Sequence, residues 1–214
     1  MVREAKNFEQ LLGGNVKGLS DLQLTEHFKL YKGYVKKLNE IWERLRTVDR
    51  SAPNYSFDDY SELKRREPIA FNGTVLHEMY FENIGNGSTQ PGDEAKRIIS
   101  GSFGSFDDWL ADAKACLMSA HGWLIVSFDY KEKRLFNNLI HTEHDGGLMA
   151  NTHTMIAVDA WEHAYFIDYQ TKKEEYVANM LSGLNWDVIG RRLQSGGSPS
   201  EKAAPAPEGV IVQH

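Results

Sequence analysis

The sequence predicts an α+β protein, in which an N-terminal α-helical hairpin domain precedes a C-terminal α/β domain with a small three-stranded antiparallel sheet. Three observations support this prediction: an apolar stripe of helical period near the N-terminus, a glycine- and asparagine-rich break at residues 83–92, and aromatic and β-branched runs after it. We therefore place the domains at residues 1–89 and 90–194. Residues 195–214 contain three prolines among many small residues and are predicted to be a disordered tail.

The N-terminal domain is predicted to contain two long helices. Ser20 is a suitable N-cap, and apolar residues recur at helical spacing from there to about Leu45, with His27 on the same stripe. Residues 47–67 contain a proline and several acids, which favours a loop or turn. The second helix is expected around residues 71–84.

The C-terminal domain is predicted to combine helices with one sheet. Residues 93–101 and 105–120 have helical patterns, and Ser105 is the expected N-cap of the second. The strands are expected at residues 122–130, 134–142 and 155–159. The segments 161–169 and 174–194 are expected to be mostly helical.

Charge and hydropathy argue against two classes of partner. The net charge is −6 and the basic residues are scattered among acids, which is not the basic stripe of a nucleic-acid-binding surface. The apolar runs are far shorter than the roughly 20 residues that a membrane span needs. With a polar N-terminus of mixed charge, these features predict a cytoplasmic protein without a nucleic-acid or membrane partner.

Cysteine usage restricts the possible chemistry. The single cysteine, Cys116, cannot form an intrachain disulfide or a cysteine-based metal site. Its alanine-rich helical surroundings predict a buried structural thiol. Any metal in this chain must therefore be bound by histidine and carboxylate.

Three stretches of sequence offer such ligands. His27 and His77 lie on the apolar faces of the two N-terminal helices, where an unpaired imidazole would cost roughly 1–3 kcal/mol, so a shared metal ion is one explanation. Asp159 and His163 are four residues apart, about 6 Å along a helix, and can reach one ion. Ordinary core histidines and a charge pair at a helix end are the alternatives. These ligand types suit iron, manganese, zinc or nickel.

The segment DAWEHAYFIDY, residues 159–169, resembles the D-x-W-E-H-A-Y-Y-x-D/Q-Y signature of the iron/manganese superoxide dismutases. Further motifs resemble this family in the same order along the chain, at residues 34–39, 77–81, 101–106, 122–123 and 184–186. The resemblance covers roughly residues 10–193.

The resemblance implies a redox enzyme with one metal ion. Matched motif to motif, the ligands of one iron or manganese ion per subunit are His27, His77, Asp159 and His163. The implied activity is the disproportionation of superoxide to dioxygen and hydrogen peroxide. The alternatives are a metalloprotein of the same fold with another oxygen or hydrolytic activity, and a non-catalytic interaction module.

The resemblance also implies roles around the metal. Tyr34 is expected to control access and relay protons, with Tyr31 as the alternative, and Trp123 and Trp161 are expected to wall the site. His144 stands where the family often has glutamine and is expected to contact metal-bound solvent; an exposed turn residue is the alternative. In the family the gateway tyrosine stands eight positions after the first ligand, whereas Tyr34 stands seven positions after His27, so we predict a regular helix without a π-bulge.

The expected assembly is a homodimer, possibly a tetramer. In the family, a glutamate of one subunit contacts the ligand histidine of the other, and Glu162 and His163 retain that pair. A second contact pairs a histidine with a tyrosine, but this chain has Tyr31 and Phe166 at those positions, so that hydrogen bond cannot form as usual.

Overall fold

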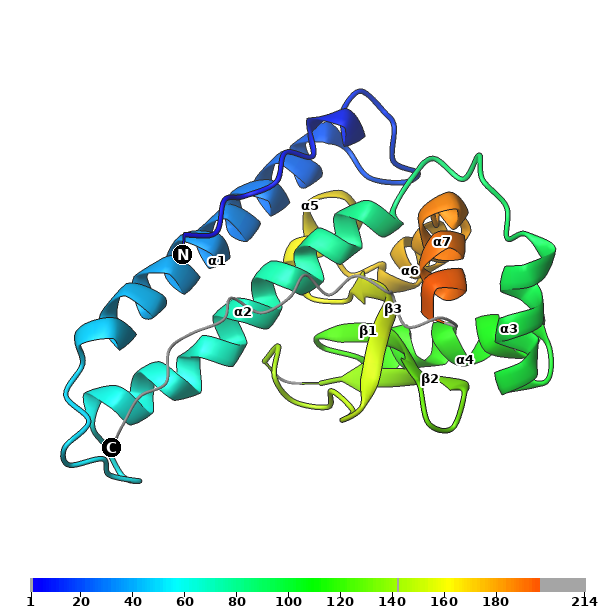
Figure 1. The fold of residues 1–214 in the computed structure, drawn as a ribbon. Helices are drawn as coiled ribbons and strands as arrows, with labels where there is room; N and C mark the ends of the chain where they lie inside the picture. The colour runs from blue at the N-terminus through cyan, green and yellow to red at the C-terminus, as the bar shows by residue number, and fades with distance from the viewer. Residues whose placement is uncertain (1, 142, 197–214) are drawn as a thin grey trace.

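The computed structural model describes residues 2–141 and 143–196 and has the predicted α+β architecture (Figure 1). Two long helices, α1 (Asp21–Thr47) and α2 (Asp59–Asn83), form an antiparallel hairpin that lies beside a part made of helices and one sheet. The predicted domain boundary near residue 89 falls in the segment after α2 and stays a prediction. The part of the predicted tail beyond residue 196 lies outside the described residues.

Helix α1 forms as its sequence predicts. The Ser20 hydroxyl accepts a hydrogen bond from the Gln23 amide and caps the helix, and the apolar stripe faces α2. The helix is α-helical from Asp21 to Thr47, without a π-helical turn. The prediction of a regular helix is therefore confirmed.

Helix α2 begins twelve residues earlier than predicted, so the assignment of residues 59–67 to a loop was wrong. The Asp58 carboxylate accepts a hydrogen bond from the Ser61 amide and caps the helix. Its first turns are largely solvated and carry ion pairs between residues three apart, such as Glu62 with Arg65, rather than an apolar stripe. Pro68 lies inside the helix, where its missing N–H removes one backbone bond without ending it.

The C-terminal part begins with two helices and the predicted sheet. Helices α3 (Asp93–Phe103) and α4 (Phe106–Ser119) precede strands β1 (Trp123–Asp129), β2 (Arg134–Ile140) and β3 (Thr152–Asp159). The sheet is antiparallel with the order β2-β1-β3, so the apolar strand β1 is central and buried on both faces. Strand β3 starts three residues earlier than predicted, because its polar first residues pair with the end of β1 after a bulge.

Short helices complete the chain. The segment after β3 forms a 3-10 turn, η2 (Glu162–Ala164), and the short α5 (Phe166–Tyr169). The helical stretch predicted at residues 174–194 is divided into α6 (Lys173–Ser182) and α7 (Trp186–Gly196), because Leu184 leaves the helix to bridge to Ile84 at the end of α2.

The core joins the hairpin to the sheet. One continuous apolar cluster runs from α1 and α2 to the sheet and the helices around it, and α2 packs directly against β3. A smaller cluster fills the far end of the hairpin around Leu38, Ile41, Leu63 and Ala70. Among the described residues, no helix is long and apolar enough to cross a membrane. Cys116 is only partly buried in α4, in contrast to the buried thiol expected.

Truncating the small cluster should destabilise the hairpin. Leu38→Ala removes a fully buried side chain and should lower the free energy of unfolding by about 2–5 kcal/mol. Leu22→Ala is the matched control, because it makes the same change in the same helix at a side chain that is 60% exposed. Denaturant titration measures both, and equal effects would contradict this packing.

Candidate metal centre

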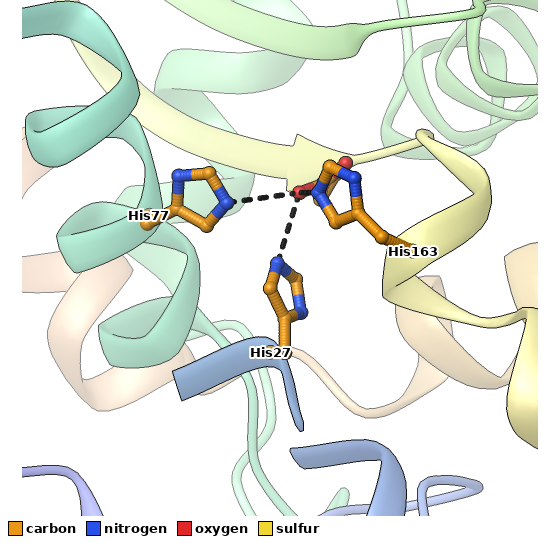
Figure 2. A group of neighbouring side chains, drawn as sticks. His27, His77 and His163 are labelled. Carbon is orange, nitrogen blue, oxygen red and sulfur yellow. Dashed lines mark hydrogen bonds and ion pairs between the residues drawn. The ribbon is translucent and has the colours of Figure 1, made fainter. Parts of the chain in front are cut away.

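Four side chains from distant parts of the chain meet at one buried point. His27 comes from α1, His77 from α2, Asp159 from the end of β3 and His163 from η2, and their potential ligand atoms all lie within 4.8 Å of one another. Figure 2 shows the three imidazoles directed at one carboxylate oxygen. The distances from Asp159 Oδ2 to the Nε2 atoms of His27, His77 and His163 are 3.2, 3.6 and 3.1 Å.

The chain turns sharply at Asp159, and this turn delivers His163. Asp159 Oδ1 accepts a hydrogen bond from the Trp161 amide at 2.9 Å, which bends the chain out of the sheet. The hydroxyl of the buried Tyr176 donates to the Asp159 carbonyl at 2.5 Å. The end of β3 is therefore fixed through both its side chain and its backbone.

A buried glutamine that sequence reasoning missed holds the backbone around His163. Gln23 Nε2 donates to the His163 carbonyl at 2.6 Å, and Gln23 Oε1 accepts from the Ile167 amide at 3.1 Å. Its position in the sequence could have indicated this role, because Gln23 lies on the buried stripe of α1, one turn before His27. A buried side-chain amide normally has hydrogen-bond partners.

Burial and mutual charge set the protonation of the cluster. Burial lowers the pKa of His27 and, more strongly, that of His77, so both imidazoles are neutral at physiological pH. Burial alone would raise the pKa of Asp159, but His163 and His27 outweigh it and keep the carboxyl ionised. For His163, burial alone would lower the pKa of the imidazole, but the nearby Asp159 carboxylate raises it above its ordinary value.

The residues fit a metal ion. Both ring nitrogens of His27 and Nε2 of His77 are buried without a hydrogen-bond partner among the described residues, which leaves lone pairs to be satisfied. Two donor atoms each about 2.1 Å from one ion are about 3.0 Å apart at 90° and about 3.6 Å apart at 120°, which agrees with the distances around Asp159 Oδ2. Three imidazoles and a carboxylate suit iron and manganese.

The tautomer of His77 is also the one that a metal requires. Its Nδ1 lies 2.5 Å from the Gly73 carbonyl, and because a carbonyl only accepts, Nδ1 carries the proton. Nε2 is then unprotonated and faces the other donors. Such a bond from the remote nitrogen of a ligand histidine orients the ring and fixes the coordinating atom.

A hydrogen-bonded chain of three side chains borders the cluster. The Trp123 indole donates to His144 Nδ1 at 2.8 Å, and His144 Nε2 lies 2.7 Å from the Tyr34 hydroxyl. Because the indole can only donate, His144 Nδ1 must accept, and the ring proton is on Nε2. Burial lowers the pKa of His144, which agrees with this neutral form. The His144 side chain is buried, so the alternative of an exposed turn residue is wrong.

The two candidate gateway tyrosines lie in different surroundings. The centre of the Tyr34 ring lies 5.3 Å from that of His77. The pKa of the Tyr34 phenol is raised by burial and, to a smaller extent, by the negative charge of Asp159. The Tyr31 hydroxyl instead donates to Glu78 Oε1 at 3.0 Å and accepts from the Lys6 amide at 2.9 Å. Of the two, only Tyr34 bonds to His144.

Two tryptophans contact histidines of the cluster, and their role as walls of the site stays a prediction. The Trp123 ring is fully buried and meets the His77 ring edge-on at 5.1 Å. The Trp161 ring stacks on that of His163 at 6.2 Å with an interplanar angle of 12°. Glu162 and Phe166, the predicted interface residues, are exposed on the surface next to His163.

Comparison with known proteins agrees with this geometry. Residues 91–192 match the family described as iron/manganese superoxide dismutases, C-terminal domain. The chain is 35% identical over 185 residues to the superoxide dismutase [Fe] of Aquifex pyrophilus, covering 84% of this chain and 86% of that protein. It is 27% identical over 180 residues to superoxide dismutase [Mn] 2 of Haloferax volcanii, covering 82% of this chain and 87% of the relative. This chain belongs to the iron/manganese superoxide dismutase family.

Proposed function

We propose that this protein is a superoxide dismutase that converts superoxide into dioxygen and hydrogen peroxide with one iron or manganese ion. The observation that carries the proposal is the buried cluster of three imidazoles and one carboxylate, in which three ring nitrogens make no hydrogen bond to the residues that the structure describes. Membership of the family supports it, and its relatives' names include both metals.

The metal and the protein supply different parts of the reaction. When bound, an iron or manganese ion would take an electron from one superoxide and give an electron to the next, which zinc cannot do. His27, His77, Asp159 and His163 would hold it. The ionised Asp159 offsets part of the positive charge in a site that water does not reach freely.

Tyr34 is the residue we assign to proton delivery. Formation of hydrogen peroxide from the second superoxide consumes two protons, and the raised pKa of Tyr34 keeps its phenol protonated at physiological pH. Because the His144 Nε2–H donates to the Tyr34 oxygen, the phenol proton is not used in this bond and is available for donation. Trp123 fixes this direction by occupying His144 Nδ1.

The bonds of His144 bear on its expected contact with metal-bound solvent. Both ring nitrogens are already engaged, one with Trp123 and one with Tyr34. An imidazole has one N–H when neutral, so direct donation to solvent would require it to leave Tyr34. The direct contact stays a prediction, and we propose that His144 acts through Tyr34.

A homodimer through the surface next to His163 is part of the proposal. Phe166 and Ile167 are each 45% exposed there, and Glu162 lies beside them. The His163 side chain is itself partly exposed, so a second copy covering this surface would complete the burial of the metal site. A symmetric dimer is the commonest way to cover such a surface. Assembly into tetramers stays a prediction.

Loss of a ligand should remove both metal and activity. His77→Ala and Asp159→Ala should each lower the iron or manganese content well below one per chain and reduce superoxide decay to the uncatalysed rate, because each removes one ligand of the metal. His153→Ala is the matched control, since His153 lies on β3 with Asp159 but is exposed. Elemental analysis and a superoxide-decay assay measure the two effects. Full activity in either ligand variant would contradict the assignment.

Loss of the Tyr34 hydroxyl should affect turnover but not metal binding. Tyr34→Phe should keep the metal content of the parent and lower the rate per metal ion about tenfold. This is less than the roughly 10²–10⁴-fold typical of a positioned acid, because water can replace the phenol in part. Superoxide decay normalised to metal content measures the change, and an unchanged rate would exclude Tyr34 as the donor.

A charge at the proposed interface should weaken the dimer. The parent should sediment with twice the chain mass of 24.3 kDa. Phe166→Glu would add one negative charge beside Glu162 in each copy and should shift the equilibrium toward the monomer. Phe57→Glu, at an exposed phenylalanine in the connection between α1 and α2, is the control and should leave the dimer intact. A monomeric parent at micromolar concentration would contradict the assembly.

A further inference from the structure

The backbone conformation at position 73 does not require glycine. Gly73 lies in the interior of α2, four residues before His77, with helical backbone angles rather than a positive φ. Glycine in a helix interior is destabilising relative to alanine, because it loses more conformational freedom on folding. The reason for the missing side chain must therefore lie in what surrounds Gly73.

The ring of Tyr34 occupies the space that a side chain at position 73 would need. A Cβ atom at this position would lie 2.6 Å from Tyr34 Cδ1, 2.8 Å from Cε1 and 3.0 Å from Cγ. These are atoms of a rigid ring, not the end of a flexible side chain. Alanine at position 73 could be accommodated only if the ring moved.

The Tyr34 ring is held on its other sides. Its hydroxyl lies 2.7 Å from His144 Nε2, and its face lies against the His77 ring at 5.3 Å. Tyr34 follows His27 by seven residues on α1, so the two side chains leave the helix only about 20° apart. Because the hydroxyl is bonded to His144, a displacement of the ring would disturb this bond.

Gly73 contacts the metal cluster through its backbone as well. Its carbonyl accepts the hydrogen bond from His77 Nδ1. The next residue toward the N-terminus, Asn72, donates from Nδ2 to the His144 carbonyl at 3.0 Å. This turn of α2 thus meets a ligand histidine, the His144 segment and the Tyr34 ring together.

We propose that Gly73 is a positioning residue, whose missing side chain lets the Tyr34 ring lie against α2 and so sets the place of the Tyr34 hydroxyl beside His144. The proposal deepens the proposed function, since it rests on Tyr34 as the proton donor. Gly73 does not touch the reacting atoms; it acts through Tyr34.

Thermal unfolding tests the packing without reference to catalysis. Gly73→Ala should lower the unfolding midpoint of the parent, although alanine is the better helix former. In the Tyr34→Ala background the ring is gone, and Gly73→Ala should raise the midpoint. Gly33→Ala is the matched control: Gly33 is an exposed glycine within α1 with nothing near its missing Cβ, so alanine should raise the midpoint in both backgrounds and leave activity unchanged.

Activity tests the consequence for Tyr34. In protein loaded with iron or manganese, Gly73→Ala should keep the metal content and lower the rate per metal ion about as much as Tyr34→Phe, roughly tenfold. In the Tyr34→Phe background it should cause no further loss, because the hydroxyl that it displaces is already absent. Two losses that multiply would overturn the proposal.

The remaining outcomes also decide the question. If Gly73→Ala raises the midpoint of the parent, as Gly33→Ala should, the ring does not constrain position 73 and the proposal is wrong. If Gly73→Ala does not fold, folding of the double variant with Tyr34→Ala supports the proposal, and failure of the double variant where Tyr34→Ala alone folds overturns it. If the loaded parent has no dismutase activity, the proposed function fails, while the midpoints still judge the packing.

Discussion

The ionised carboxyl group of Asp159 is the constraint on which the structure around the site depends. It is completely buried, and among the described residues no lysine or arginine forms an ion pair with it. A buried charge without compensation is very costly, so the surrounding imidazoles and a cation must supply the balance. Strand β3 ends beside the hairpin, where α1 and α2 each contribute a histidine next to this carboxylate. The four side chains therefore link the two halves of the chain in addition to the apolar core.

Much of this arrangement could be predicted because it follows from local patterns. The apolar stripe that carries His27, the cap at Ser20 and the alternation of strands and turns each depend on nearby residues. The four ligands could be named because their motifs resemble those of a known family. What the motifs did not contain was the support behind the ligands: Gln23 and Tyr176 hold the backbone of His163 and Asp159 from far away in the sequence.

The errors have a common physical origin. The first turns of α2 are stabilised by a cap and by surface ion pairs, so residues 59–67 lack the apolar periodicity by which a helix is predicted from sequence. The choice between Tyr31 and Tyr34 could not be made from spacing, since both leave α1 within about 40° of His27. Only the positions of their distant partners, Glu78 and His144, distinguish the two.

The two departures from the family pattern, at Tyr31 and Phe166, are related, because both concern the same hydrogen bond. The resemblance implies a hydrogen bond between these positions across the dimer, which tyrosine and phenylalanine cannot reproduce. Tyr31 instead finds its partners within its own chain: burial, followed by contacts that include Glu78, raises the pKa of its phenol to about 12, and Arg3 binds the same glutamate at 2.8 Å. Once the Tyr31 hydroxyl is satisfied internally, a tyrosine at position 166 would have no such partner. Phe166 is therefore the residue expected opposite a second copy, and the proposed interface depends on apolar contact and on Glu162 rather than on that hydrogen bond.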